Sequence, residues 1–166
     1  AGPILIDLFN RGFDTLQKRP PEERWALEDR FIETLRLQRN DKHLLDWITR
    51  LEKNERNSAR KFRWKDERVC AYLLDINNPA AAKHEVAFLK EAAIAPDQTH
   101  LAALRQGDVE RALGNYDAAL KFYKDAQDRF RSRHKTGTAG GRLTYVGARK
   151  QRSSETNATG KAASRR

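Results

Sequence analysis

Hydrophobic residues recur at three- and four-residue steps along most of residues 4–130, which is the spacing of one face of an α-helix. Adjacent prolines at positions 20 and 21 end the first of these helices, because proline has no amide donor. The two-residue alternation of a half-buried strand is not seen in any segment. The pattern predicts an all-α fold that begins with a helix over 4–18, whose apolar stripe is Leu5, Phe9, Phe13 and Leu16.

Polar or glycine-containing breaks divide the following residues into six helices, which pair as three hairpins. The turns inside the pairs lie 37 residues apart, at Asn40, Asn77 and Gly114. The hairpins are predicted at 22–54, 58–95 and 98–130. A fixed spacing of this size is typical of hairpins that stack on one another, so we expect an α-solenoid over 1–130. An irregular helical bundle with evenly spaced turns is the alternative.

The predicted core of these hairpins consists of apolar stripes on five of their six helices. Pro79 is well placed to open the fifth helix, and Gly114 to supply the left-handed end of the sixth. The stripes are Leu27, Phe31 and Leu35; Leu44, Ile48 and Leu51; Phe62, Val69, Leu73 and Ile76; Ala82, Val86 and Leu89; and Ala119, Tyr123 and Ala126.

The third hairpin carries small residues where its two helices would cross. Gly107 is in the first helix, Gly114-Asn115-Tyr116 forms the turn, and Ala119 and Ala126 flank Tyr123 in the second. In these features residues 100–131 resemble a tetratricopeptide repeat. Helices approach to about 8 Å only where the crossing residues are small, which supports the same register. The preceding hairpins match less well: Cys70 and Ala82 keep two of the small positions, while Glu33 and Leu44 are bulky.

The resemblance implies a non-catalytic scaffold that binds a protein or peptide and acts as an interaction module in a larger complex. In that family the first helix of each hairpin lines a concave groove. Trp64 is expected to be an exposed aromatic anchor there, a residue type that dominates many interfaces. Carried over position by position, the groove would comprise Trp64, Glu67, Arg68, Leu101, Leu104, Arg105, Asp108 and Arg111. The alternative for Trp64 is a place in the core between hairpins.

Most of the formal charge of +10 lies in the last 36 residues, where ten basic residues face one glutamate. This tail, 131–166, is rich in Ser, Thr and Gly and is expected to be disordered. Together with a basic run at the start of the fourth helix, it offers an alternative function, salt-sensitive binding of nucleic acid or another polyanion. The residues of that alternative are Arg60, Lys61, Arg63, Lys65, Arg149, Lys150 and Arg152. A solvated helix face is the other interpretation of the run in the fourth helix.

Residues that would support catalysis or metal binding are scattered along the chain. His84-Glu85 lacks a second histidine four residues later, and a single cysteine excludes sites built on paired cysteines. The glycine-rich segment 137–142 lacks the Gly-Lys-Ser/Thr ending of a phosphate loop. We therefore expect a protein that is not an enzyme and uses no cofactor or metal.

The ends and partners of the chain carry three further expectations. The sequence contains no methionine, so we expect Ala1 to be a processed end, the start of a cloned fragment or a tag remnant. The compartment stays open, with an exported or periplasmic protein mildly favoured. No apolar run is long enough to span a membrane. An end hairpin of a stack should expose an apolar flank, through which the chain could associate with itself.

Overall fold

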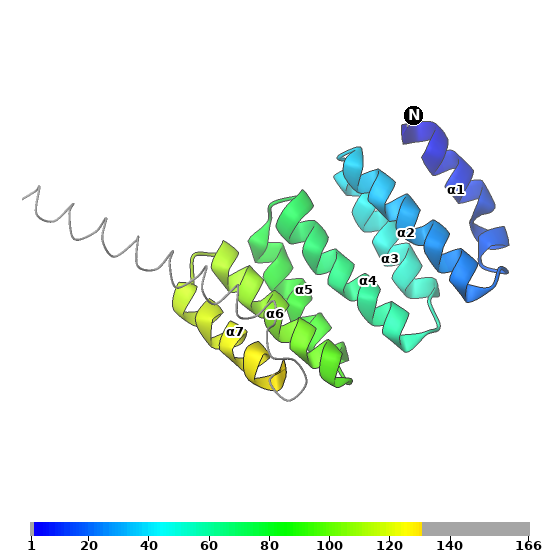
Figure 1. Cartoon of the computed structure of the whole chain (residues 1–166). Helices are drawn as coiled ribbons and strands as arrows, with labels where there is room; N and C mark the ends of the chain where they lie inside the picture. Colours follow the sequence, from blue (N-terminus) through cyan, green and yellow to red (C-terminus); the bar gives the residue numbers. More distant parts are fainter. Residues whose placement is uncertain (1, 131–166) are drawn as a thin grey trace, which may run out of the picture. The chain divides into compact units, whose positions relative to one another are not determined.

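A computed structural model describes residues 2–130, and each of these lies in a helix or in a short connection (Figure 1). The all-α prediction is therefore confirmed for the described part of the chain. The predicted tail 131–166 lies outside the described residues. The helices form two units, one ending at Ile76 and one starting at Asn77. Since the boundary falls inside the predicted hairpin 58–95, its two helices belong to different units.

Within residues 2–130, the first unit contains four α-helices and one turn of π-helix, and the second contains three α-helices. Those of the first unit are α1 (Gly2–Leu16), α2 (Pro21–Leu37), α3 (Asp41–Asn54), α4 (Ser58–Cys70) and η1 (Ala71–Asp75). Those of the second are α5 (Pro79–Ala92), α6 (Pro96–Ala112) and α7 (Tyr116–Phe130). The predicted ends differ by up to three residues from these, except that the fourth helix changes to π-helix after Cys70.

Short polar residues and left-handed backbone produce the helix ends. The side chains of Asn57 and Asn78 accept hydrogen bonds from the first turns of α4 and α5, at 2.9 and 3.1 Å. The backbone is left-handed at Arg39 (φ 50°), Asn77 (φ 56°) and Gly114 (φ 80°). The predicted breaks near positions 40 and 114 are thus confirmed as turns within a unit, each with one left-handed residue, and Asn77 lies at the boundary between the two units.

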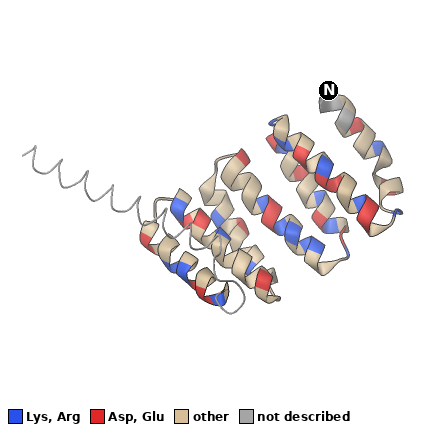
Figure 2. Cartoon of the chain, in the orientation of Figure 1, with Lys and Arg blue, Asp and Glu red and all other residues tan. Residues whose placement is uncertain are grey.

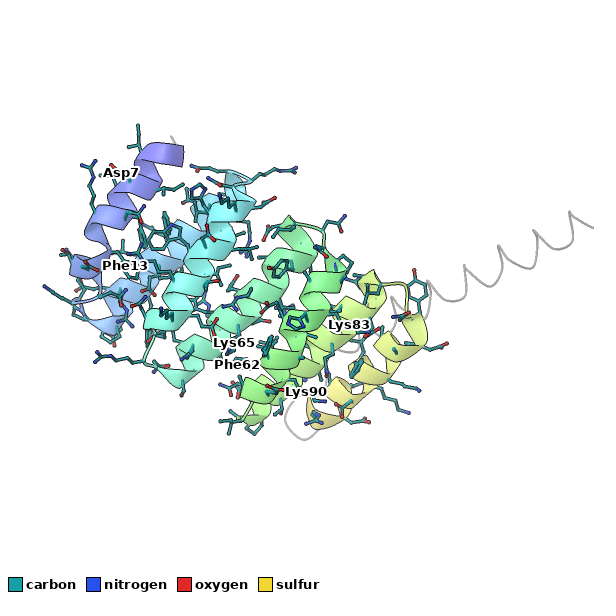
Figure 3. The ribbon with its side chains drawn as sticks, turned by 180° about the vertical axis from the view of Figure 1, so that it is seen from behind. Asp7, Phe13, Phe62, Lys65, Lys83 and Lys90 are labelled. Carbon is teal, nitrogen blue, oxygen red and sulfur yellow. The ribbon has the colours of Figure 1, made fainter. Side chains whose placement is uncertain are left out.

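Aromatic rings from three helices form the core of the first unit. Phe9 of α1 stacks on Phe31 of α2 at 3.7 Å between ring centroids, and Trp47 of α3 meets both rings edge-on at 4.9 and 5.1 Å. Phe13 lies against Trp47, and Figure 3 shows it on α1. Leu35, Leu44, Ile48 and Leu51 are buried as predicted. Leu27 is not: it is 43% exposed, and Glu28 is buried instead.

The core of the second unit is packed around one tyrosine. Tyr123 of α7 is fully buried, and its hydroxyl donates to Asp108 Oδ1 of α6 at 2.8 Å. A Cβ atom at Gly107 would lie 2.2 Å from the Tyr123 ring, so no larger residue fits there without movement. Ala119 and Ala126 are also fully buried. The predicted use of small residues in this hairpin is confirmed by these contacts.

The end of the fourth helix differs from the prediction. Instead of continuing as α-helix to Ile76, the chain makes a π-helical turn that the Ile76 amide closes on Ala71 O at 2.9 Å. Leu73 and Ile76, predicted as core, are only partly buried. The wider turn brings the Asp75 carboxylate to Arg36 of α2, at 2.9 Å from Nε.

Candidate functional site

A groove between α2 and α4 is the surface of the first unit that best matches the predicted binding face. Its volume is about 350 Å³. The residues of α2 that line it recur mainly at three- and four-residue steps, so they occupy one face of that helix. The lining residues are Asp29, Ile32, Glu33, Arg36, Leu37, Arg63, Trp64 and Glu67.

The floor of this groove is apolar and buried. Ile32 and Trp64 are buried, and Trp64 is only 1% exposed. The Arg60 guanidinium lies over the Trp64 ring, 4.5 Å from its centroid. The expectation that Trp64 is an exposed anchor is therefore wrong. Its indole belongs to the core of the first unit, which leaves the more exposed groove side chains to make contacts.

Ion pairs fix most of the charged side chains at the rim. Arg36 bonds Glu67 at 3.0 Å, in addition to Asp75, and Arg63 bonds Asp29 at 3.0 Å. Burial alone would lower the pKa of Arg36, but hydrogen bonds to Asp75 and Glu67 outweigh it and raise that pKa. Glu33 is exposed and has no ion pair among residues 2–130. The rim therefore presents a carboxylate with unused hydrogen-bonding capacity beside an apolar floor.

A buried glutamate holds the start of α4 against α2, and so positions the groove. Both Glu55 carboxylate oxygens accept from Arg24 Nη2 at 3.0 Å, and Oε2 also accepts from Trp25 Nε1 at 3.1 Å. Oε1 accepts from the backbone amides of Arg56 and Asn57, at 2.8 and 2.9 Å. A carboxylate with this many donors is well satisfied in a buried place.

A second buried glutamate, Glu28, is less well satisfied. Arg24 Nε lies 3.4 Å from Glu28 Oε1, and Arg60 Nη2 lies 3.7 Å from Oε2. Burial raises the pKa of Glu28, although Arg24 and Arg60 act in the opposite direction. The two glutamates therefore have different roles. Glu55 organises the connection between α3 and α4, whereas keeping Glu28 charged in its buried place costs free energy.

The basic run of α4 is mostly neutralised within the first unit. Arg60, predicted to bind a polyanion, is buried and pairs with Asp29 and Glu28. Lys65 bonds Glu52 of α3 at 2.7 Å, and Arg63 is held by Asp29. Lys61 is exposed. Figure 2 shows basic and acidic positions interspersed along α2 and α4 rather than a surface of one sign.

The other half of the polyanion prediction concerns the tail. Arg149, Lys150 and Arg152 lie outside the described residues. Of the predicted groove residues in the first unit, Glu67 lines the groove, whereas Arg68 turns to Glu52 of α3. Arg68 therefore links the helices on another side of α4.

The predicted binding residues of α6 are largely engaged in packing. Leu104 and Asp108 are buried, contrary to the expectation of a groove position, because α7 covers them through Ala119 and Tyr123. Arg105 lies 3.4 Å from Asp108. Leu101 and Arg111 are partly buried. These five residues do not line the groove of the second unit.

That groove lies instead beside α5, with a volume of about 560 Å³. Its apolar lining includes Val86, Val109 and Phe122, and Lys83 bonds Glu110 across it at 2.9 Å. Burial alone would raise the pKa of Glu110, but hydrogen bonds from Lys83 and Asn115 outweigh it and lower that pKa. Figure 3 labels Lys83 and Lys90, the two lysines of this groove.

Groups that could support other chemistry have structural roles. His100 is buried: its Nδ1 lies 2.9 Å from Ala126 O and its ring 4.1 Å from that of Phe130. Over residues 2–130, histidine, cysteine and acidic side chains do not gather in any set of three that could hold a metal ion. No helix in the described part of the chain has the length and apolar character needed to cross a membrane.

Sequence reasoning missed the α2 side of the groove. Asp29, Glu33 and Arg36 do share a helix face in the sequence. That spacing is equally typical of a solvated face, so it could not identify a groove by itself. The deciding fact is the approach of Arg63 and Glu67 from a helix some 30 residues later.

Comparisons with known proteins identified no relative of this chain. No family model matches the chain, and neither the curated proteins nor the solved structures gave a match. The likeness to a tetratricopeptide repeat therefore depends on the residues and contacts of the chain itself.

Proposed function

We propose that this protein is a non-catalytic binding module of helical-repeat type, in which stacked hairpins recognise a segment of another protein. The α6–α7 hairpin supports this proposal, since Gly107, Tyr123 and the two alanines pack as the resemblance implies. The regular turns at Arg39, Asn77 and Gly114 support it as well.

The groove between α2 and α4 is the observation that carries the proposal. A buried apolar floor with a charged rim is the usual composition of a protein-recognition surface. Leu37 projects at its edge, 78% exposed, and Glu33 is a carboxylate without an ion pair among residues 2–130. We expect the bound segment to place an apolar side chain against Leu37 and a lysine or arginine near Glu33.

Two groove variants with matched controls test this function. The full chain is used as bait in an extract of its source cells, and captured proteins are identified by mass spectrometry. Leu37→Ser and Glu33→Lys should lose the captured partner. Their controls should retain it: Leu74→Ser changes an equally exposed leucine (75%) outside the groove, and Asp46→Lys makes the same charge change on α3.

The polyanion alternative receives less support from the described residues. Arg60, Arg63 and Lys65 are occupied by carboxylates of α2 and α3. If binding nevertheless requires the tail and falls steeply with salt, the polyanion function replaces the one proposed. If the groove variants and their controls capture the partner equally, the proposal that the α2–α4 groove binds it would also be contradicted.

A further inference from the structure

A second apolar groove lies between α1 and α2, on a different side of α2 from the proposed binding groove. Its volume is about 340 Å³. Leu8, Gly12 and Leu16 line it from α1, and Leu27, Arg30 and Phe31 line it from α2. Leu8 is 61% exposed, and Ile4, one turn earlier on α1, is 68% exposed. The groove and its edge thus expose large apolar side chains that contacts within the first unit do not cover.

Gly12 is a second and independent observation at this groove. It lies inside α1 with ordinary helical backbone, where glycine is less favourable than alanine. Apart from its chain neighbours and the backbone of its own helix, no atom lies within 4 Å of the position that its Cβ would occupy, in contrast to Gly107, which Tyr123 contacts. Packing within the described residues therefore does not require a glycine here. Close approach by the backbone of another helix would require one.

The exposed face of α1 carries side chains whose chemistry complements this groove. Ile4 and Leu8 lie on one face of α1. Asp7 flanks that face, and Figure 3 shows it near the start of α1. Arg30, beside the groove, is exposed and has no ion pair within residues 2–130. The Asp7 carboxylate is exposed and pairs with the exposed Arg11 at 2.6 Å, so it can also accept from an arginine of another molecule.

We propose that two copies of this chain associate through this surface, with α1 of the second copy lying in the α1–α2 groove. A surface that carries both the groove and the side chains that fill it is self-complementary, as a two-fold interface requires. In this arrangement Leu8 of each copy packs near Gly12 of the other, and Arg30 of each copy pairs with the second copy's Asp7. The inference does not depend on the proposed function.

Sedimentation equilibrium of the full chain tests the proposal. One helix face per copy buries less than the roughly 1,200–2,000 Å² of a standard interface, so the dimer should be weak and measurements should extend to several hundred micromolar, as an order-of-magnitude range. Wild type should show a monomer–dimer equilibrium. Gly12→Leu fills the groove and should weaken dimerisation by about tenfold or more. Gly12→Ala adds only a methyl group and should have a smaller effect.

Charge exchange provides the specific control. Arg30→Asp and Asp7→Arg should each weaken the dimer, and the double variant Asp7→Arg/Arg30→Asp should restore it. These are exposed positions, so circular dichroism of the variants should match wild type. A wild-type chain that stays monomeric, a dimer unaffected by Gly12→Leu, or a charge exchange without recovery would each overturn the proposal. Because none of these variants changes a residue of the α2–α4 groove, partner capture tests the two proposals separately.

Discussion

Two buried glutamates of the first unit show how residues of the same type can have opposite energetic effects. Glu55 accepts five hydrogen bonds, whereas Glu28 meets its arginines at longer distances. We expect Glu55→Gln to destabilise the fold by about 3–5 kcal/mol, because the amide presents donors to donors in a buried place. Urea unfolding at pH 7 measures this loss.

Glu28→Gln should behave differently. Because the pKa of Glu28 is raised in the folded state, the fold holds its proton more strongly than the unfolded chain does. The stability contribution of Glu28 is therefore greatest at low pH and falls as pH rises through the raised pKa. At pH 7 a neutral glutamine side chain in its place should leave the free energy of unfolding equal to or above that of wild type. A loss as large as that of Glu55→Gln would contradict the assignment.

A substitution at Gly107 tests the packing of α6 on α7. A methyl group at this position meets the buried Tyr123 ring, which its bond to Asp108 also restrains. We expect Gly107→Ala to destabilise the chain by about 1–3 kcal/mol, despite the better helix propensity of alanine. Thermal unfolding compares it with Gly12→Ala, which should stabilise the monomer because alanine favours a helix more than glycine does and no atom of another helix lies within 4 Å of the new methyl group. Equal effects of the two substitutions would contradict this difference.

At the scale of elements, the helix ends follow from the sequence because their causes are local. Prolines, the Asn57 and Asn78 caps, and the left-handed Gly114 all act within a few residues. The choice of buried face is less local. Leu27 and Glu28 are equally compatible with the Phe31 and Leu35 stripe, and it is Glu28 that is buried, with Arg60 of α4 3.7 Å from its carboxylate.

The expectation for Trp64 fails for the same reason. The spacing places it on the face that a repeat presents to a ligand, but side chains from other helices cover it and Arg60 lies over its ring. The π-helical turn after Cys70 has no sequence signal that we identified. The general location of the site on the fourth helix is thus predictable from the sequence, while its α2 half and its exposed contacts required the structure.

Substitutions at two left-handed turn residues should change the stability of the fold in opposite directions. Gly114 has φ 80°, which strains any residue with a Cβ, whereas Arg39 already has such a side chain at φ 50°. Gly114→Ala should destabilise the fold by about 1–2 kcal/mol, and Arg39→Gly should stabilise it slightly. Chemical denaturation of both variants measures the pair. Stabilisation by Gly114→Ala would contradict the claim that a Cβ atom is strained at this position.

For the whole molecule, the net charge and the binding surface point to different functions. The body has interspersed charges with many internal ion pairs, while the sequence places most of the excess basic charge in 131–166. A protein-binding groove and a polyanion-binding tail predict different salt responses, since release of counterions makes phosphate binding fall steeply with salt.

The dissociation constant of the captured partner tests the central claim most directly. It is measured by calorimetry at about 50 and 200 mM salt for three full-length chains: wild type, the groove variant Leu37→Ser/Glu33→Lys, and the tail variant Arg149→Gln/Lys150→Gln/Arg152→Gln. The account predicts that the groove variant loses about tenfold or more in affinity at both salt concentrations, while the tail variant binds like wild type. Unchanged binding by the groove variant, with loss in the tail variant and at high salt, would contradict it.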